Sequence, residues 1–195
     1  MLLAVRIVRY AEISLSVDIE VDECGDIETK VRYLRSMSEE LQIEFQKWEG
    51  TGNTFVIIDG FKYAGFDLQN IDNKVITRIC EQENTDGVIV LEASELPHVD
   101  LKCDYRNADG SRSFCGNGTR ASFLYAKMQG WVVDEAIFEA CDGLHKVKLN
   151  KDLDLPSVKF MPLSSPVEID HDDFRGDLFI NTGSPHHIHV VHDKQ

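Results

Sequence analysis

The stretch Cys115-Gly116-Asn117-Gly118 places a cysteine at the start of a glycine-flanked turn that leads straight into a helical pattern. Apolar residues follow at i, i+3, i+4 and i+7, one face of an α-helix, at Ala121, Leu124, Tyr125 and Met128. The helix predicted over 116–129 begins beside the thiol, with free backbone N–H groups and the positive end of its dipole close by. That position favours a thiolate, the form in which cysteine acts as a nucleophile or base. A buried, inert cysteine in an ordinary turn is the alternative interpretation.

The residues that precede this cysteine predict a strand followed by a polar turn. Apolar and polar side chains alternate over 99–106, the period-2 pattern of a half-buried strand. Residues 107–111, Asn-Ala-Asp-Gly-Ser, are dense in turn formers. Strand, turn, cysteine and helix in succession bring a thiol together with several amide and hydroxyl groups.

The rest of the chain alternates short strands with one further helix. A helix is predicted over 68–83, with Asp67 as its candidate N-cap. The other predicted strands lie at 43–48, 54–59, 88–91, 135–140, 144–150, 157–161, 178–181 and 187–192. Residues 162–173 are expected to form a loop. Many strands with two embedded helices indicate an α+β fold.

Composition and charge exclude several classes of function. The 195 residues are 43% hydrophobic, enough for one packed domain, and carry a net charge of -14. Such a surface repels nucleic-acid phosphates and anionic lipid, so we expect neither nucleic-acid nor membrane binding. Five cysteines without a C-x-x-C spacing disfavour a zinc site and a disulfide framework. The apolar N-terminal stretch is interrupted by Arg6 and Arg9, unlike a secretory signal, which predicts a cytoplasmic protein.

Three segments resemble the diaminopimelate epimerase family and occur in that family's order. NADGSRSFCGNGTR at 107–120 resembles the segment with the family's first catalytic cysteine. Residues 45–59 resemble its opening strand–loop–strand, and residues 181–186 its Gly-(Asn/Ser)-Pro-His loop. The resemblance covers 43–192 and implies an α+β domain in which a curled mixed or antiparallel sheet surrounds the central cysteine-bearing helix.

The resemblance also implies an activity. Members of this family are isomerases that interconvert LL- and meso-diaminopimelate, for lysine and cell-wall synthesis, without a cofactor. The partner would be a small-molecule amino-acid substrate. Cys115 would be one of two catalytic cysteines that exchange a proton at the α-carbon, and His186 would help to set their protonation.

Five residues are implied to bind this substrate. The backbone N–H groups of Gly116 and Asn117 would hold its α-carboxylate, unless they only form the turn into the helix. Asn53 would bind the distal end, although asparagine also suits a left-handed turn. Asn107 is a substrate ligand or a turn former, and the resemblance favours the ligand. Ser184 stands where the family commonly has a ligand Asn or Ser.

No metal is expected, although histidines cluster near the end of the sequence. In a strand, His187 and His189 would share one face, and His186 and His192 the other, so four ligands would not converge.

The family is built from two similar halves, each with one cysteine, and the sequence matches the first. No second Cys-Gly-Ser-Gly segment is present, so 41–195 is expected to form the N-terminal epimerase-like domain, with the second catalytic domain absent. Residues 1–40 are an unexplained extension: either Met37 is the real start and 1–36 lie upstream of it, or 1–36 form a poorly ordered arm. One cysteine cannot complete an inversion, so the isolated chain is expected to be inactive. Its unpartnered apolar face predicts a homodimer or larger assembly.

Departures from the family keep two other functions open. Thr54 replaces the usual Asp, the loop at 84–87 is shortened, and Asn107 lies one residue closer to Cys115. A related cofactor-independent racemase or isomerase, acting on proline, hydroxyproline or another small acid, is one alternative. A non-catalytic half-domain that only pairs with a partner is the other.

Overall fold

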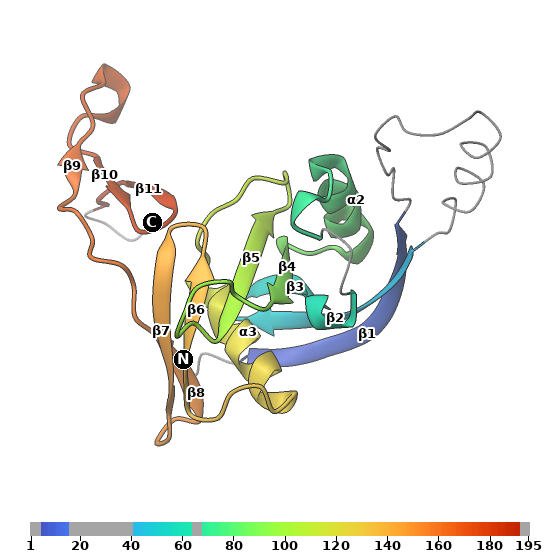
Figure 1. The fold of residues 1–195 in the computed structure, drawn as a ribbon. Coiled ribbons are helices and arrows are strands. Elements are labelled where there is room, and N and C mark those ends of the chain that lie inside the picture. The colour runs from blue at the N-terminus through green and yellow to red at the C-terminus, as the bar shows by residue number, and fades with distance from the viewer. Residues whose placement is uncertain (1–4, 16–40, 64–67, 192–195) are drawn as a thin grey trace, which may run out of the picture.

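The computed structural model describes residues 5–15, 41–63 and 68–191. Its main feature is an eight-stranded mixed sheet whose strands follow one another in chain order (Figure 1). The strands are β1 (Val5–Leu15), β2 (Leu41–Gly50), β3 (Asn53–Asp59), β4 (Gly87–Glu92), β5 (Leu101–Asn107), β6 (Glu135–Ala140), β7 (Gly143–Asn150) and β8 (Leu155–Val158). The predicted α+β class is confirmed.

Two helices act as crossovers between parallel strands, while the other neighbours in this sheet are antiparallel. α2 (Asn73–Glu83) connects β3 to β4, and α3 (Gly116–Met128) connects β5 to β6. A parallel pair needs such a long connection because the chain must return to the same end of the sheet. α3 packs against β2, β3, β4, β5 and β8, so the sheet curls around the cysteine-bearing helix as expected.

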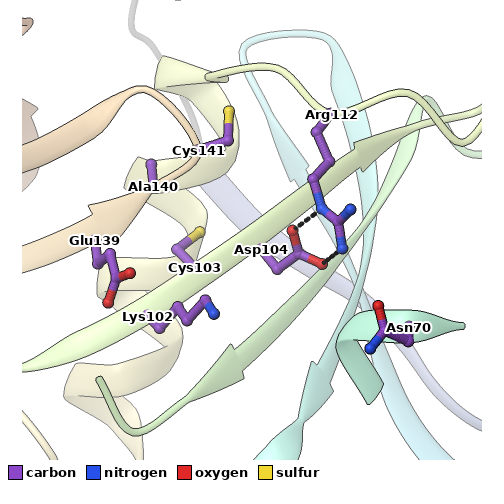
Figure 2. A pocket seen from close by; sticks show the side chains of 8 residues that line it. All are labelled: Asn70, Lys102, Cys103, Asp104, Arg112, Glu139, Ala140 and Cys141. Carbon is purple, nitrogen blue, oxygen red and sulfur yellow. Dashed lines mark hydrogen bonds and ion pairs between the residues drawn. The ribbon is translucent and has the colours of Figure 1, made fainter. Parts of the chain in front are cut away.

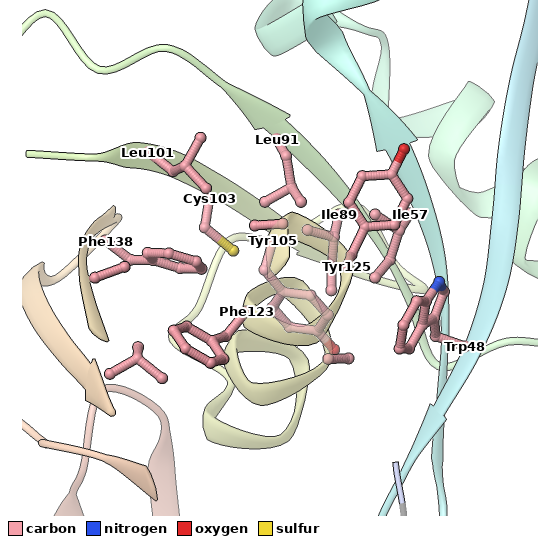
Figure 3. Packing of buried hydrophobic residues seen from close by; sticks show 14 of the residues in the cluster. Trp48, Ile57, Ile89, Leu91, Leu101, Cys103, Tyr105, Phe123, Tyr125 and Phe138 are labelled. Atoms are coloured by element: carbon pink, nitrogen blue, oxygen red, sulfur yellow. The ribbon is translucent and has the colours of Figure 1, made fainter. Parts of the chain in front are cut away.

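Strands β3 and β4 are buried on both faces, which explains their nearly continuous apolar sequences. Successive side chains point to opposite faces, so Phe55 and Ile57 face α3, whereas Val56 and Ile58 face α2. Figure 3 shows side chains of the surrounding strands packed around Phe123 and Tyr125 of α3. Truncating a buried phenylalanine costs about 3–5 kcal/mol, so this cluster positions α3 firmly.

The start of α2 differs from the prediction. The helix begins at Asn73, with the Asp72 side chain accepting a 2.7 Å hydrogen bond from the backbone of Lys74. A short 3-10 turn, η2 (Leu68–Asn70), precedes it, and the predicted N-cap Asp67 lies outside the described residues. The apolar spacing at the start of the predicted helix therefore belongs partly to the 3-10 turn.

Part of the expected N-terminal extension joins the sheet. β1 pairs with β2 in antiparallel register from Val5↔Gly50 to Leu15↔Leu41, with a shift between Ile7 and Arg9. The remaining residues of the 1–40 segment, including Met37, lie outside the described residues.

A second, three-stranded sheet follows β8. It contains β9 (Val167–Glu168), β10 (Leu178–Asn181) and β11 (Pro185–Ile188), with β10 in the middle. The predicted loop over 162–173 thus contains the short strand β9 and the start of the 3-10 turn η3 (Asp172–Phe174), and η1 (Gly60–Tyr63) is a further 3-10 turn. Within the described residues, no helix has the length and apolar character needed to cross a membrane.

Candidate active site at the start of helix α3

Cys115 is the N-cap residue of α3, as its sequence position predicts. Its backbone is extended, with φ -126° and ψ 103°, and its Sγ accepts a hydrogen bond from Gly118 N at 3.3 Å. Its carbonyl oxygen accepts from both the backbone N and the Oγ1 of Thr119, at 2.8 and 2.9 Å. The thiol therefore lies directly over the free N–H groups of the first helical turn.

Burial has a larger effect on the pKa of the Cys115 thiol than the start of the helix has. Desolvation raises the pKa of Cys115 above its ordinary value, opposed by hydrogen bonds from the amides of Gly118 and Asn117 and by the nearby positive charge of Arg120. The expectation that the helix start would produce a thiolate is therefore wrong for this chain, because the cost of burying a charge is larger than the gain from the amides. Burial therefore favours the neutral thiol at Cys115.

The loop with Ser184 lies beside the cysteine. Phe114 N donates to Gly183 O at 3.0 Å, and Ser184 Oγ donates to Phe114 O at 2.9 Å. Gly183 has φ +95°, and a Cβ there would lie 2.6 Å from both Asp142 Oδ2 and Phe114 Cβ. Only glycine fits this approach, so the loop is pinned to the residue that precedes Cys115.

Aromatic rings pack around Phe114, the residue that precedes Cys115. Phe114 stacks on the fully buried His145, with ring centroids 3.8 Å apart and planes 9° apart. His145 Nε2 lies 2.9 Å from Asp142 Oδ1, and Phe160 stands edge-on to Phe114. Sequence patterns did not indicate His145, because it lies on β7 and reaches Phe114 only through the curl of the sheet.

A chain of side-chain hydrogen bonds connects the first turn of α3 with the β2–β3 turn. Asn117 Nδ2 donates to Asn53 Oδ1 at 2.7 Å. Arg120 Nη2 donates to Asn117 Oδ1 at 2.5 Å and to Thr51 Oγ1 at 2.7 Å. The structure thus brings Asn53, Asn117 and Cys115 to one place, with Arg120 as a member that the sequence patterns did not indicate.

Asn107 fills the turn-forming role, one of the two roles predicted for it. Its Nδ2 donates to Ser111 O, Ser111 Oγ and Ser113 Oγ at 3.0–3.1 Å, and its Oδ1 accepts from Tyr105 OH. These bonds hold the polar turn that leads to Cys115. A role as substrate ligand remains a prediction.

The histidines of the terminal cluster that the structure describes, His186, His187 and His189, make two separate sets of contacts. His186 is exposed, and its Nδ1 lies 2.8 Å from Ser184 O and 3.3 Å from Thr182 Oγ1, both in its own loop. His187 Nε2 and His189 Nδ1 contact the two oxygens of the buried Asp177, at 2.5 and 2.6 Å. No cluster suited to a metal ion occurs in the part of the chain that the structure describes.

Thr54 stands where the family usually has Asp. It contacts the carboxylate of Asp86, the residue that directly precedes β4. Asp86 Oδ2 accepts hydrogen bonds from Thr54 N at 2.7 Å and Thr54 Oγ1 at 3.2 Å. Both residues line a surface hollow of about 420 Å³, together with Lys47, Glu49, Gly52, Asn84 and Thr85. The shortened loop at 84–87 thus places an acidic group next to the β2–β3 turn.

A second hollow of about 410 Å³ opens where β5 and β6 diverge (Figure 2). Asp104 lies at its wall and accepts from Arg112 at 2.7 and 3.3 Å and from the buried Arg106 at 3.2 Å. Cys103 and Cys141 line it as well, but neither starts a helix as Cys115 does.

Comparison with known proteins supports the resemblance. No family model matches the chain. It is 35% identical over 150 residues to a protein named diaminopimelate epimerase from Flavobacterium psychrophilum, a match that covers 75% of this chain and 54% of that protein. It is 32% identical over 164 residues to the protein of the same name from Aquifex aeolicus, covering 77% and 58% respectively. The chain therefore spans a little over half the length of these curated relatives.

Among solved structures, the chain is similar to a phenazine biosynthesis protein of the PhzF family from Bacillus anthracis. The TM-score is 0.50 at 13% identity, and the match covers 70% of this chain and 49% of that chain. At this identity the likeness concerns the fold alone.

Proposed function

Because this chain is a homologue of the diaminopimelate epimerases, we propose that it forms the Cys115-bearing part of an isomerase that interconverts LL- and meso-diaminopimelate. The observation that carries the proposal is the position of Cys115. It caps α3 beside Asn53 and Asn117, within the segment that resembles the family's first catalytic cysteine.

The reaction requires two groups on opposite faces of the substrate. Inverting an α-carbon means removing a proton from one face and delivering one to the other, and both groups must be shielded from water. Burial raises the pKa of Cys115 and so favours its protonated form, which suits the delivery of a proton. A second cysteine, supplied with the rest of the enzyme, would act as the base in that direction, and the two would exchange roles in reverse.

Binding of the substrate follows from the start of the helix. The N–H groups of Gly116 and Asn117 lie at the positive end of a 13-residue helix, a favourable place for an α-carboxylate. Gly116 also packs closely on Phe160, since a Cβ there would lie 3.0 Å from that ring. Asn53 and Ser184 flank this point and would hold the rest of the substrate.

One observation favours a second candidate, a related isomerase with another small acid as its substrate. The contact between Thr54 and Asp86 puts a carboxylate near the turn that carries Asn53. A different distribution of charge there would select a different distal group on the substrate.

The test is an assay in ²H₂O with LL-diaminopimelate, using the gene product as its native host makes it. Proton NMR follows loss of the α-proton signal and appearance of the meso isomer. We expect Cys115→Ser to reduce both rates by at least about 100-fold, in line with the loss of a general acid–base group. Cys141→Ser is the matched control and should retain activity, because Cys141 is exposed and outside this site.

Three further results would bear on the proposal. Polypeptide 1–195 on its own should give no net inversion, since among the cysteines of the described residues only Cys115 starts a helix. Full activity of Cys115→Ser would refute the role of this thiol. Turnover of proline or hydroxyproline without turnover of diaminopimelate would select the second candidate.

A further inference from the structure

We propose that Arg120 is a positioning residue that sets the direction of the hydrogen-bond chain through Asn117 to Asn53. As a result Asn53 presents N–H donors to a ligand, and this end of the site selects a hydrogen-bond acceptor such as a carboxylate. The identity of the ligand rests on the proposed function, whereas the direction of the chain does not.

The direction follows from the chemistry of the three side chains. Arginine can only donate hydrogen bonds, so the Asn117 atom that contacts Arg120 must be the oxygen. The opposite end of the Asn117 amide is then its NH₂ group, which must donate to the oxygen of Asn53. The Asn53 amide is thereby oriented too, and its NH₂ group faces away from Asn117. Among the described residues, this NH₂ group has no hydrogen-bond acceptor.

The conformation of the β2–β3 turn supports a functional reason for this arrangement. Thr51 and Gly52 have φ values of 56° and 87°, so both central residues of the turn are in the left-handed region. Asn, Asp and Gly are preferred at the first of these positions, and a β-branched residue there is strained. Thr51 nevertheless occupies it and holds Arg120 through its Oγ1. Strain of this kind is concentrated where function requires it.

Close packing fixes the position of the β2–β3 turn against the first turn of α3. A Cβ on Gly50 would lie 3.2 Å from the backbone oxygen of Asn117, so the end of β2 directly abuts the first turn of α3. Arg120 also stabilises the thiolate form of Cys115 by its charge, which lowers the pKa of that thiol against the effect of burial. One side chain thus influences both the proton-transfer group and the orientation of the binding group.

The orientation is tested in ¹⁵N-labelled 1–195 by NMR of the asparagine side-chain amides. In the unaltered chain, we expect two separate Asn117 Nδ2 proton signals, with the proton bound to Asn53 shifted downfield. Arg120→Met should abolish that shift and allow the amide to flip, while Arg120→Lys, which keeps a donor, should retain part of it. Arg175→Met is the control for loss of one positive charge, because Arg175 is exposed and bonds only Asp172 among the described residues.

Thr51→Val provides a second variant in case Arg120→Met does not fold. It removes the hydroxyl that anchors Arg120 and leaves the size of the side chain nearly unchanged. We expect the downfield shift of the Asn117 Nδ2 proton to decrease in this variant as well, but by less than in Arg120→Met. Asn117 signals identical to those of the unaltered chain, in whichever of the two variants is folded, would overturn the inference.

Ligand selection is tested with two probes of equal length and opposite charge. Glutarate should shift the Asn53 Nδ2 protons, whereas 1,5-diaminopentane should not, and Asn53→Asp should abolish the effect of glutarate on neighbouring Asn117. A response to the diamine alone would overturn the inference. A response to glutarate without one to LL-diaminopimelate would leave the inference standing and refute the substrate of the proposed function.

Discussion

Two effects oppose one another at Cys115, and their balance determines its chemistry. The amides of the first helical turn and the charge of Arg120 favour a thiolate, while burial favours the thiol and is the larger effect. Sequence patterns indicate the helix start but not the depth of burial, which depends on how β8 and residues 160–184 fold over the helix. The residue type and position were therefore predictable, and its protonation state was not.

The first prediction concerns alkylation of the cysteines. Iodoacetamide reacts with the thiolate, whose fraction rises about tenfold per pH unit below the thiol pKa. Among the cysteines of the described residues, we expect exposed Cys141 to react fastest at pH 7 and Cys115 more slowly. Cys103 should stay unreactive, since burial raises its pKa to about 12.

Labelling rates from pH 7 to pH 10, read from tryptic peptides by mass spectrometry, provide the measurement. The rate at Cys115 should still be rising above pH 9, because its pKa is raised above the ordinary value. Arg120→Met should slow it further by removing a charge that favours the thiolate. A Cys115 rate that is already constant at pH 7 would contradict this account and restore the thiolate.

The second prediction concerns Gly183. Substitution by Ala forces a side chain into the left-handed region, at about 1–2 kcal/mol, and adds a clash with Asp142 and Phe114 worth about 1–3 kcal/mol. Gly176→Ala is the matched control, because Gly176 has φ +85° and a Cβ added there would meet no other atom within 4 Å. Urea unfolding should show Gly183→Ala to be less stable than the control. Equal free energies of unfolding would mean that the loop is not pinned to Phe114.

At the scale of elements, periodicity predicted most of the strands and both helices to within a few residues. β6 and β10 have the predicted bounds, and α3 ends one residue early. The errors have physical causes. Residues 68–72 form a 3-10 turn and a cap before α2, and β1 has no counterpart in the segments that resemble the family. Arg120 and His145 were missed because their partners are distant in sequence.

The third prediction concerns the cap of α3. Serine is a good N-cap and can accept the hydrogen bond from Gly118 as the thiol does, whereas alanine cannot. We expect Cys115→Ser to keep the stability of the parent within about 0.5 kcal/mol, and Cys115→Ala to lose about 1 kcal/mol. Chemical unfolding followed by circular dichroism measures both. If Ala proves as stable as Ser, the cap contributes nothing, and loss of activity in either variant is then due to the thiol alone.

At the scale of the whole molecule, apolar exposure is concentrated towards the end of the described residues. Of all the large apolar side chains that are exposed among the described residues, more than half lie in the segment after β8. They are Phe160, Met161, Leu163, Val167, Phe174, Phe179, Val190 and Val191. Val167 and Phe179 are cross-strand partners on β9 and β10 and form one patch. Such patches tend to find partners, although the net charge of -14 opposes self-association.

The fourth prediction follows from this patch. Polypeptide 1–195 should self-associate more strongly as salt rises, because salt screens repulsion beyond about 8 Å at physiological ionic strength. Val167→Ser with Phe179→Ser should shift it towards monomer. Met128→Ser with Val133→Ser removes exposed apolar groups elsewhere and should not. Sedimentation velocity at two salt concentrations measures this, and a monomer at both in the unaltered chain would refute the expected assembly.

The junction of β5 with β6 has a mechanical consequence. These strands meet through two residue pairs, Leu101↔Phe138 and Lys102↔Glu139, whereas every other pair of neighbours in the long sheet is joined by at least four. The sheet therefore consists of two panels, and backbone hydrogen bonds resist their relative motion least at this junction. α3 forms the covalent link between the panels, and Cys115 lies at the end of that link nearest β5. Bending at this junction would change the angle at which the first panel presents Asn53 to the second.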